Sequence, residues 1–174
     1  MKSLSAAFTA LSLAFAAATA AAAPVSLSFS NNNIMSDGND AAVFNDSYDF
    51  VLNAQTLLSG IVTTHTPEAS GPWVNITSAF IQAASGGAIY ALTETQAVNW
   101  DADEFGVETW TFSPQWLAAG SWQLHVAGEG YAVKAPEGYD ADLSGRSAEL
   151  PEPAALALVA VALAGLSLSR RRAR

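Results

Sequence analysis

The sequence contains no cysteine and only two histidines, His65 and His125. Without cysteine the chain has no disulfide, no thiolate metal ligand and no cysteine nucleophile. The histidines do not form an H-x-x-x-H pair, and no serine lies in a G-x-S-x-G sequence. Signatures of a zinc site and of a serine nucleophile are therefore missing, and the core must be stabilised by packing alone.

Positive charge is scarce in the middle of the chain. The 7 Lys+Arg residues oppose 16 Asp+Glu residues, and five of the cations are terminal: Lys2, Arg170, Arg171, Arg172 and Arg174. Residues 23–150 contain every acidic residue except Glu152, which leaves 15 carboxylates against Lys134 and Arg146, a formal charge of −13. Such a surface repels phosphate backbones and anionic headgroups, so we expect no nucleic-acid partner.

The first residues have the composition of a secretory signal. Lys2 precedes an apolar run from Leu4 to Ala18, and alanines follow from Ala20 to Ala23. A charged start, a short apolar segment and small residues at the cleavage point predict a signal peptide over residues 1–22, removed by signal peptidase. A buried helix or a permanent anchor is the alternative interpretation.

The last residues combine three unlike features in a fixed order. Pro151-Glu152-Pro153 precedes an apolar segment, Ala154 to Ser169, and an arginine-rich end. As a helix the apolar segment would be about 24 Å long, slightly short of the ~30 Å hydrocarbon core of a membrane. The arginines would stay on the cytoplasmic side, which predicts a transient span of the inner membrane with the preceding domain outside.

This C-terminal pattern, residues 151–174, resembles the PEP-CTERM sorting signal of Gram-negative bacteria. The resemblance implies recognition of Pro151, Glu152 and Pro153 by an exosortase, with Arg170, Arg171, Arg172 and Arg174 as the cytoplasmic stop. It also implies removal of the tail, export to the cell envelope, outer surface or medium, and a role linked to exopolysaccharide and biofilm.

The middle of the chain alternates apolar strand-length runs with turn residues. This pattern predicts one all-β domain over residues 23–134, an antiparallel β-sandwich or jelly roll, with a closed barrel as the alternative. The candidate strands are Val25–Phe29, Tyr48–Leu52, Thr56–Thr64, Trp73–Gln82, Ala88–Thr93, Val107–Phe112, Trp122–Val126 and Tyr131–Lys134. Alternation assigns to the core Trp110, Phe112, Trp122, Leu124 and Val126, and directs His125 to solvent. Residues 135–150, acidic and containing glycines, are expected to form a flexible spacer.

A second resemblance begins at Phe44-Asn45-Asp46-Ser47-Tyr48, which is similar to the opening motif of the FxDxF family of PEP-CTERM proteins, with Tyr48 in place of the second phenylalanine. The later segment Leu117–Gly128 is similar to the ending of such domains. The family has no established activity to transfer. The even spacing of Phe44, Tyr48 and Phe50 predicts that all three face the core, with Asp46 capping or bonding a turn.

Acidic clusters provide the weak candidates for a cofactor site. Asp101, Asp103 and Glu104 have the carboxylate density of a calcium loop, but Phe105 occupies a position that an EF-hand reserves for Asp or Asn. An acidic surface loop is the favoured interpretation, so no cofactor is expected and calcium is the alternative. Asp37, Asp40, Asp46 and Asp49 form a second cluster of the same kind.

Aromatic residues beside turns provide the candidates for ligand contact. Trp73, Trp100 and Trp116 could stack on sugar rings, and packing in the core or at its rim is the alternative. A polysaccharide-processing enzyme with paired carboxylates is a second hypothesis, since the required separation of ~5 to 9.5 Å depends on the fold. We expect a non-enzymatic matrix or binding protein.

Overall fold

The computed structural model describes residues 22–66, 73–101 and 106–148, and these ranges contain nine β-strands and no helix. The strands are β1 (Pro24–Ile34), β2 (Ala42–Leu52), β3 (Thr56–His65), β4 (Asn75–Ala83), β5 (Ile89–Ala91), β6 (Thr93–Gln96), β7 (Thr109–Leu117), β8 (Gly120–Gly130) and β9 (Glu137–Ser147).

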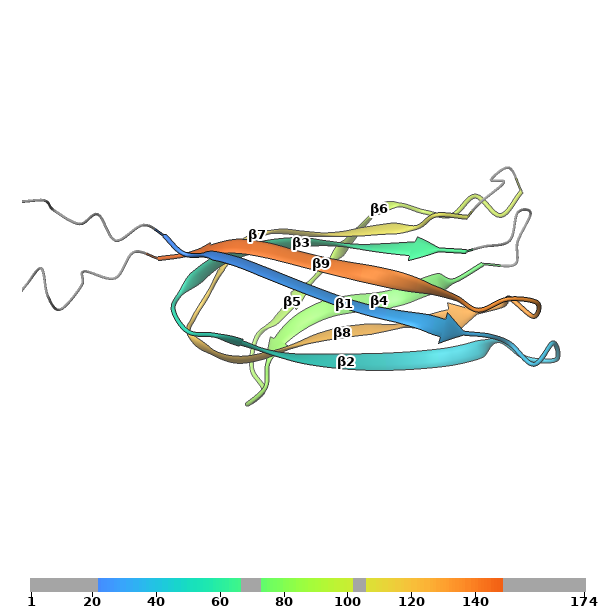
Figure 1. The fold of residues 1–174 in the computed structure, drawn as a ribbon, viewed down its shortest axis with the longest axis horizontal. Helices are drawn as coiled ribbons and strands as arrows, with labels where there is room; N and C mark the ends of the chain where they lie inside the picture. Colours follow the sequence, from blue (N-terminus) through green and yellow to red (C-terminus); the bar gives the residue numbers. More distant parts are fainter. Residues whose placement is uncertain (1–21, 67–72, 102–105, 149–174) are drawn as a thin grey trace, which may run out of the picture. The chain divides into compact units, whose positions relative to one another are not determined.

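The strands form two antiparallel sheets that lie face to face (Figure 1). One sheet has the order β1-β9-β3-β7-β6 and the other has the order β2-β8-β4-β5. The first four strands alternate between the two sheets, so each connection from β1 to β4 crosses from one sheet to the other. The predicted antiparallel β-sandwich is thereby confirmed.

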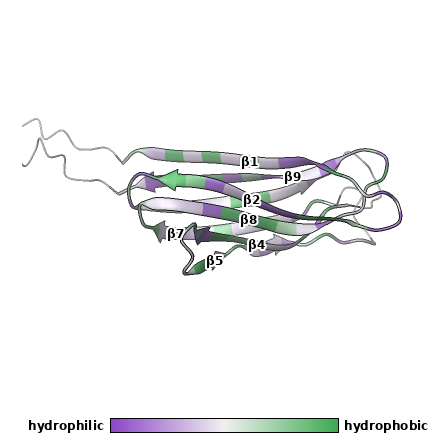
Figure 2. Ribbon diagram, turned by 90° about the horizontal axis from the view of Figure 1, so that it is seen from below, coloured by the Kyte–Doolittle hydropathy of each residue, from purple (hydrophilic) through white to green (hydrophobic). Residues whose placement is uncertain are grey.

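The core fills the space between the sheets, and the strands alternate in hydropathy along their length (Figure 2). Strand β8 alternates most regularly, with Trp122, Leu124 and Val126 buried as predicted. Phe112 is also buried, whereas Trp110 is half-buried at the border of the core. His125 lies on the outer face of β8, where its ring stacks on that of Phe80 at a centroid distance of 4.6 Å.

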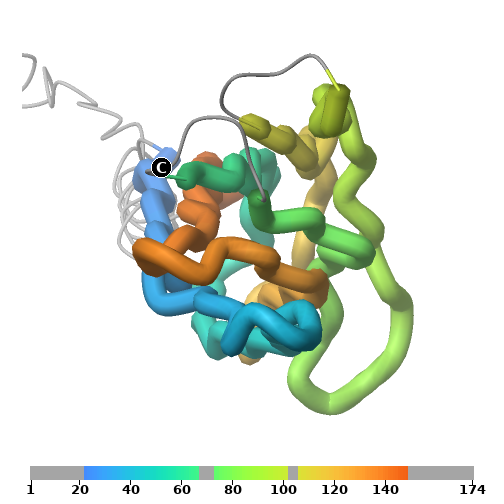
Figure 3. Tube along the Cα trace, turned by 90° about the vertical axis from the view of Figure 1, so that its right-hand side faces the viewer, coloured from blue at the N-terminus to red at the C-terminus, as the bar shows by residue number. Residues whose placement is uncertain are grey.

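The two ends of the sandwich differ in what they contain. At the loop end, which faces the viewer in Figure 3, lie the connections β1–β2, β3–β4, β6–β7 and β8–β9. At the opposite, terminal end, the first and last strands pair, and the backbone N–H of Ser147 donates to the carbonyl of Ala23 at 3.1 Å. Both ends of the described domain therefore leave it side by side.

The spacer predicted for residues 135–150 is wrong over most of its length. Strand β9 lies between β1 and β3, with Tyr139, Ala141 and Leu143 buried. Asp140 and Asp142 alternate with these and face solvent, whereas Glu137 at the start of the strand is buried. Gly138 permits close strand contact, because a Cβ there would lie 1.9 Å from the carbonyl oxygen of Asn31. The acids and glycines that suggested a loop belong to a central strand.

Two further strand predictions need correction. Residues 131–134 do not form a strand, because β8 ends at Gly130 and the chain turns there into β9. The candidate strand Ala88–Thr93 is divided, since β5 belongs to the four-stranded sheet and β6 to the five-stranded sheet. The buried side chain of Leu92 marks the crossing between the sheets.

The signal peptide, apart from Ala22, and the sorting tail with its expected helix at 154–169 lie outside the described residues. Within the described ranges no helix has the length and apolar character needed to cross a membrane.

Candidate functional site

The motif residues Phe44, Asp46 and Tyr48 meet on the inward face of β2. The carboxylate of Asp46 accepts hydrogen bonds from the Tyr139 hydroxyl at 2.6 Å and from Asn31 Nδ2 at 2.8 Å. The hydroxyls of Tyr48 and Tyr139 are 2.9 Å apart. Asp46 therefore does not cap a turn, because its even position directs it between the sheets with Phe44 and Tyr48.

This Asp46 cluster joins β2 to β1 and β9 across the two sheets. Burial raises the pKa of the Tyr139 hydroxyl, and its hydrogen bond to Asp46 raises that pKa further. Burial also raises the pKa of Tyr48. Both tyrosines therefore stay neutral, and Tyr139 donates to the carboxylate across the physiological range. The motif residues Asp46 and Tyr48 therefore form a structural contact between the two sheets.

At the loop end, Trp73 and Trp100 form an aromatic cluster with Tyr131. Trp73 is buried, and its ring centroid lies 5.5 Å from that of Trp100. Trp100 is 49% exposed and approaches Tyr131 edge-on at 5.9 Å. The burial of Trp73 excludes it as a sugar platform, whereas Trp100 keeps an open surface.

Two buried glutamates lie beneath this aromatic cluster. Glu108 accepts hydrogen bonds from the backbone N–H of Ile76 at 2.7 Å and from the indole of Trp110. Burial raises the pKa of Glu108, and these two donors oppose the rise. Glu137 accepts from the backbone N–H groups of Tyr131 and Ala132 at 2.8 and 3.0 Å. Both carboxyl groups satisfy backbone donors where strand pairing ends.

The structure tests the first calcium candidate only in part. Asp101 is exposed on the loop before β7, and Asp103 and Glu104 lie outside the described residues. Among the residues that are described, no group of three or more His, Asp or Glu side chains is arranged to hold a metal ion.

The second acidic cluster is dispersed. Asp37 accepts from the backbone N–H groups of Asn39 and Asp40 at 2.9 and 3.2 Å in the β1–β2 turn, and these bonds lower its pKa. Asp46 lies between the sheets, and Asp49 accepts from Gln123 at 2.8 Å on the outer face of β2. The carboxylates of Asp37, Asp46 and Asp49 therefore have separate local roles.

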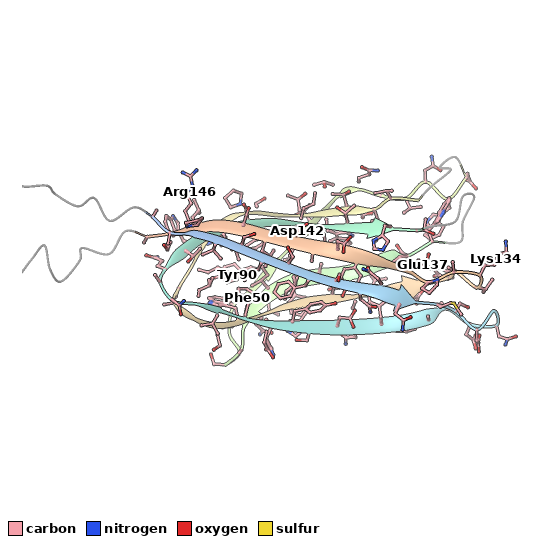
Figure 4. The ribbon with its side chains drawn as sticks, viewed as in Figure 1. Phe50, Tyr90, Lys134, Glu137, Asp142 and Arg146 are labelled. Carbon is pink, nitrogen blue, oxygen red and sulfur yellow. The ribbon has the colours of Figure 1, made fainter. Side chains whose placement is uncertain are left out.

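An open groove of about 370 Å³ lies on the outer face of the five-stranded sheet. Its lining residues come from β3, β7 and β9: Leu57, Ser59, Pro114, Ser144, Gly145 and Arg146. Figure 4 places Arg146 at the terminal end of β9, whereas Lys134 and Glu137 lie at the loop end. The groove and the aromatic cluster thus occupy opposite ends of the domain.

The pairing of three strands explains how the groove is built. Leu57 on β3 lies opposite Arg146 on one side and Trp116 on the other, so the three side chains form one row on the outer face. Beside this row, two residues of β7 face the single residue Ser59, which is a β-bulge. Pro114 occupies the bulge, where its missing N–H breaks no ladder hydrogen bond.

Neither protein-family models nor curated proteins match this chain.

The row Trp116–Leu57–Arg146 combines the contacts that sugar recognition uses. Trp116 is 48% exposed and borders the groove, so its ring can stack on a sugar face. Arg146 offers a fork of N–H donors, and two strand spacings place it about 10 Å from Trp116. Ser59 and Ser144, which are paired in the next outward row, also line the groove.

Trp116 was predicted from the sequence as a candidate for ligand contact, whereas Arg146 was not. Arg146 was assigned to the spacer, although the alternation from Tyr139 to Ser147 already indicated that its side chain shares a face with Asp142 and Ser144. The pairing with Leu57 has no sequence signal, because strand order is a property of the fold.

Proposed function

We propose that this chain is an exported envelope or matrix protein whose β-sandwich binds polysaccharide without cleaving it. The strand order, in which β1 pairs with β9 and β2 with β8, supports a jelly-roll form of the sandwich. Export and sorting rest on the terminal segments, and binding rests on the groove.

The observation that carries the binding proposal is the row of Trp116, Leu57 and Arg146 beside an open groove. An exposed aromatic ring, a multiple hydrogen-bond donor and small hydroxyl residues on a rigid sheet suit an extended chain of sugars. The flat outer face leaves both directions of such a chain open.

A binding role is favoured over catalysis by the state of the carboxyl groups. Glu108 is the carboxyl whose raised pKa would suit a general acid. Its side chain is 1% exposed, and both oxygens accept hydrogen bonds from the protein. A sugar oxygen therefore has no access to it.

Retention on exopolysaccharide extracted from the producing cells tests the binding proposal. The processed protein is compared with Trp116→Ala and Trp100→Ala, because the two tryptophans have almost equal exposure at opposite ends. We expect Trp116→Ala to weaken binding about tenfold, equivalent to ~1.4 kcal/mol, and Trp100→Ala to leave it unchanged. Equal losses, or a loss in Trp100→Ala alone, would reject the groove as the site. Release of new reducing ends would reject the non-enzymatic role.

The sorting proposal predicts two processing events. Mass spectrometry of the protein from its host should find a mature start near Ala23 and the absence of residues 154–174. Replacement of Pro151-Glu152-Pro153 by alanines should leave the tail in place. Export of protein that retains its arginine end would contradict tail removal.

A further inference from the structure

Among residues 22–66, 73–101 and 106–148, no ion pair or hydrogen bond engages the side chain of Arg146, although the domain is rich in carboxylates. His65 and Asp140 form an ion pair at 3.5 Å, which does not involve Arg146. Its direct neighbours across the sheet are Pro24 and Leu57, which carry no charge. The guanidinium is therefore available to a ligand that enters the groove.

Charge is unevenly distributed along this face of the sheet. The outward carboxylates of β9 are Asp140, toward the loop end, and Asp142, at the middle of the strand, where it accepts a hydrogen bond from Ser28. Asp142 precedes Arg146 by four residues, about 13 Å along a strand. This distance exceeds the screening length of about 8 Å at physiological ionic strength. The groove thus contains local positive charge despite the acidic balance of the domain.

A guanidinium recognises a carboxylate through two parallel N–H donors. The serine hydroxyls of the groove would accept or donate to sugar hydroxyls, and Trp116 would contact a neighbouring ring of the same chain. A neutral sugar would use the tryptophan and the serines, but it would leave the charge of Arg146 without a counter-ion.

We infer that the groove takes a carboxylated sugar, a uronic-acid unit of an anionic polysaccharide, with its carboxylate on Arg146 and an adjacent ring on Trp116. The inference rests on the proposed polysaccharide binding and specifies the chemical class of the ligand.

The test compares two forms of one polymer: the exopolysaccharide of the producing cells, and the same material after its carboxyl groups are reduced to primary alcohols. We expect the processed protein to bind the native form at least tenfold more tightly than the reduced form. Arg146→Gln should remove this preference, so that the native form binds no more tightly than the reduced form. Arg146→Lys should restore part of the preference, because lysine keeps the charge and lacks the fork.

Lys134→Gln is the matched control, since it removes the same unit of charge at the loop end. It should keep the full preference, and a loss equal to that of Arg146→Gln would overturn the inference by attributing the preference to overall charge. Equal binding of the two polymers would overturn the inference and leave polysaccharide binding intact. Failure of both polymers to bind would overturn the proposed function itself. Thermal melts of all variants identify any loss that follows from unfolding.

Discussion

The loop end and the terminal end of the sandwich each have an exposed tryptophan, but their charged side chains differ in burial and in hydrogen bonding. At the loop end, Glu108 and Glu137 are buried and accept hydrogen bonds from the backbone. At the terminal end, Arg146 is exposed beside an open groove. A buried carboxyl group that accepts hydrogen bonds from the protein has a structural role, whereas an exposed charge beside a groove is open to a ligand.

Trp100 and Trp116 show the same difference between the loop end and the terminal end. They are almost equally exposed, yet Trp100 packs against Trp73 and Tyr131, whereas Trp116 lies opposite Leu57 at the groove, two residues beyond Pro114 in the β-bulge. Equal exposure therefore does not imply equal roles. If substitutions at the groove reduce stability as much as substitutions at the loop end, the inferred difference between the two ends is wrong.

The largest loss of stability is expected for Glu137→Ala at the loop end. The substitution leaves the buried N–H groups of Tyr131 and Ala132 without their acceptor, and each such group costs about 1–3 kcal/mol. Chemical denaturation should show a loss of about 3 kcal/mol in the free energy of unfolding. Arg146→Ala is the control and should change it by less than about 0.5 kcal/mol. Comparable losses in the two variants would remove the distinction between the ends.

Glu108→Gln should reduce stability and also change its dependence on pH. Glutamine provides one carbonyl acceptor for two donors, so a loss of about 1–3 kcal/mol is expected at every pH. Burial raises the pKa of Glu108 in the folded state. Its favourable contribution is therefore complete below the unfolded pKa and declines as pH rises through the folded pKa.

Denaturation curves from acid to neutral pH check this second effect. Wild-type protein should lose stability relative to Glu108→Gln as pH rises through that window. Asp40→Asn, at an exposed position and not among the groups that shift the pKa of Glu108, is the control for a general change in charge. A constant difference between wild type and Glu108→Gln at all pH values would contradict the burial argument.

Tyr139→Phe tests the contact between the sheets, which lies between the two ends. The variant keeps the ring and removes the hydroxyl that donates to Asp46, so we expect a loss of about 1–2 kcal/mol. Tyr48→Phe should cost less, because its hydroxyl contacts Tyr139 and not the carboxylate. The reverse order in urea titrations would show that Tyr48, and not Tyr139, holds the sheets together.

The smallest effects are expected for the exposed tryptophans. Trp100→Ala should cost about 1 kcal/mol, because its ring covers Trp73 and touches Tyr131. Trp116→Ala should cost less than about 0.5 kcal/mol while it weakens polysaccharide binding. Melting temperatures separate the two. A larger loss for Trp116→Ala would assign that residue to packing.

Prediction from the sequence succeeded where apolar and polar residues alternated regularly. It failed over residues 135–150, where acidic residues and glycines resembled the composition of a loop. The even positions of β8 identified Trp122, Leu124 and Val126 as core residues. The same rule applied to β2 would have directed Asp46 inward, but an unpartnered carboxylate in a core is unfavourable. Its partners Tyr139 and Asn31 are distant in sequence and adjacent only in the folded protein.

By itself, the amino-acid sequence determined the all-β class, the strand periodicity and the acidic balance, because these depend on the order and kind of side chains along one segment. The tertiary structure alone decided which strands became neighbours. It placed β9 between β1 and β3, and thereby set Arg146 beside Leu57 and Trp116. Strand order follows from how two sheets bury their apolar faces together, and that packing is a property of the whole chain.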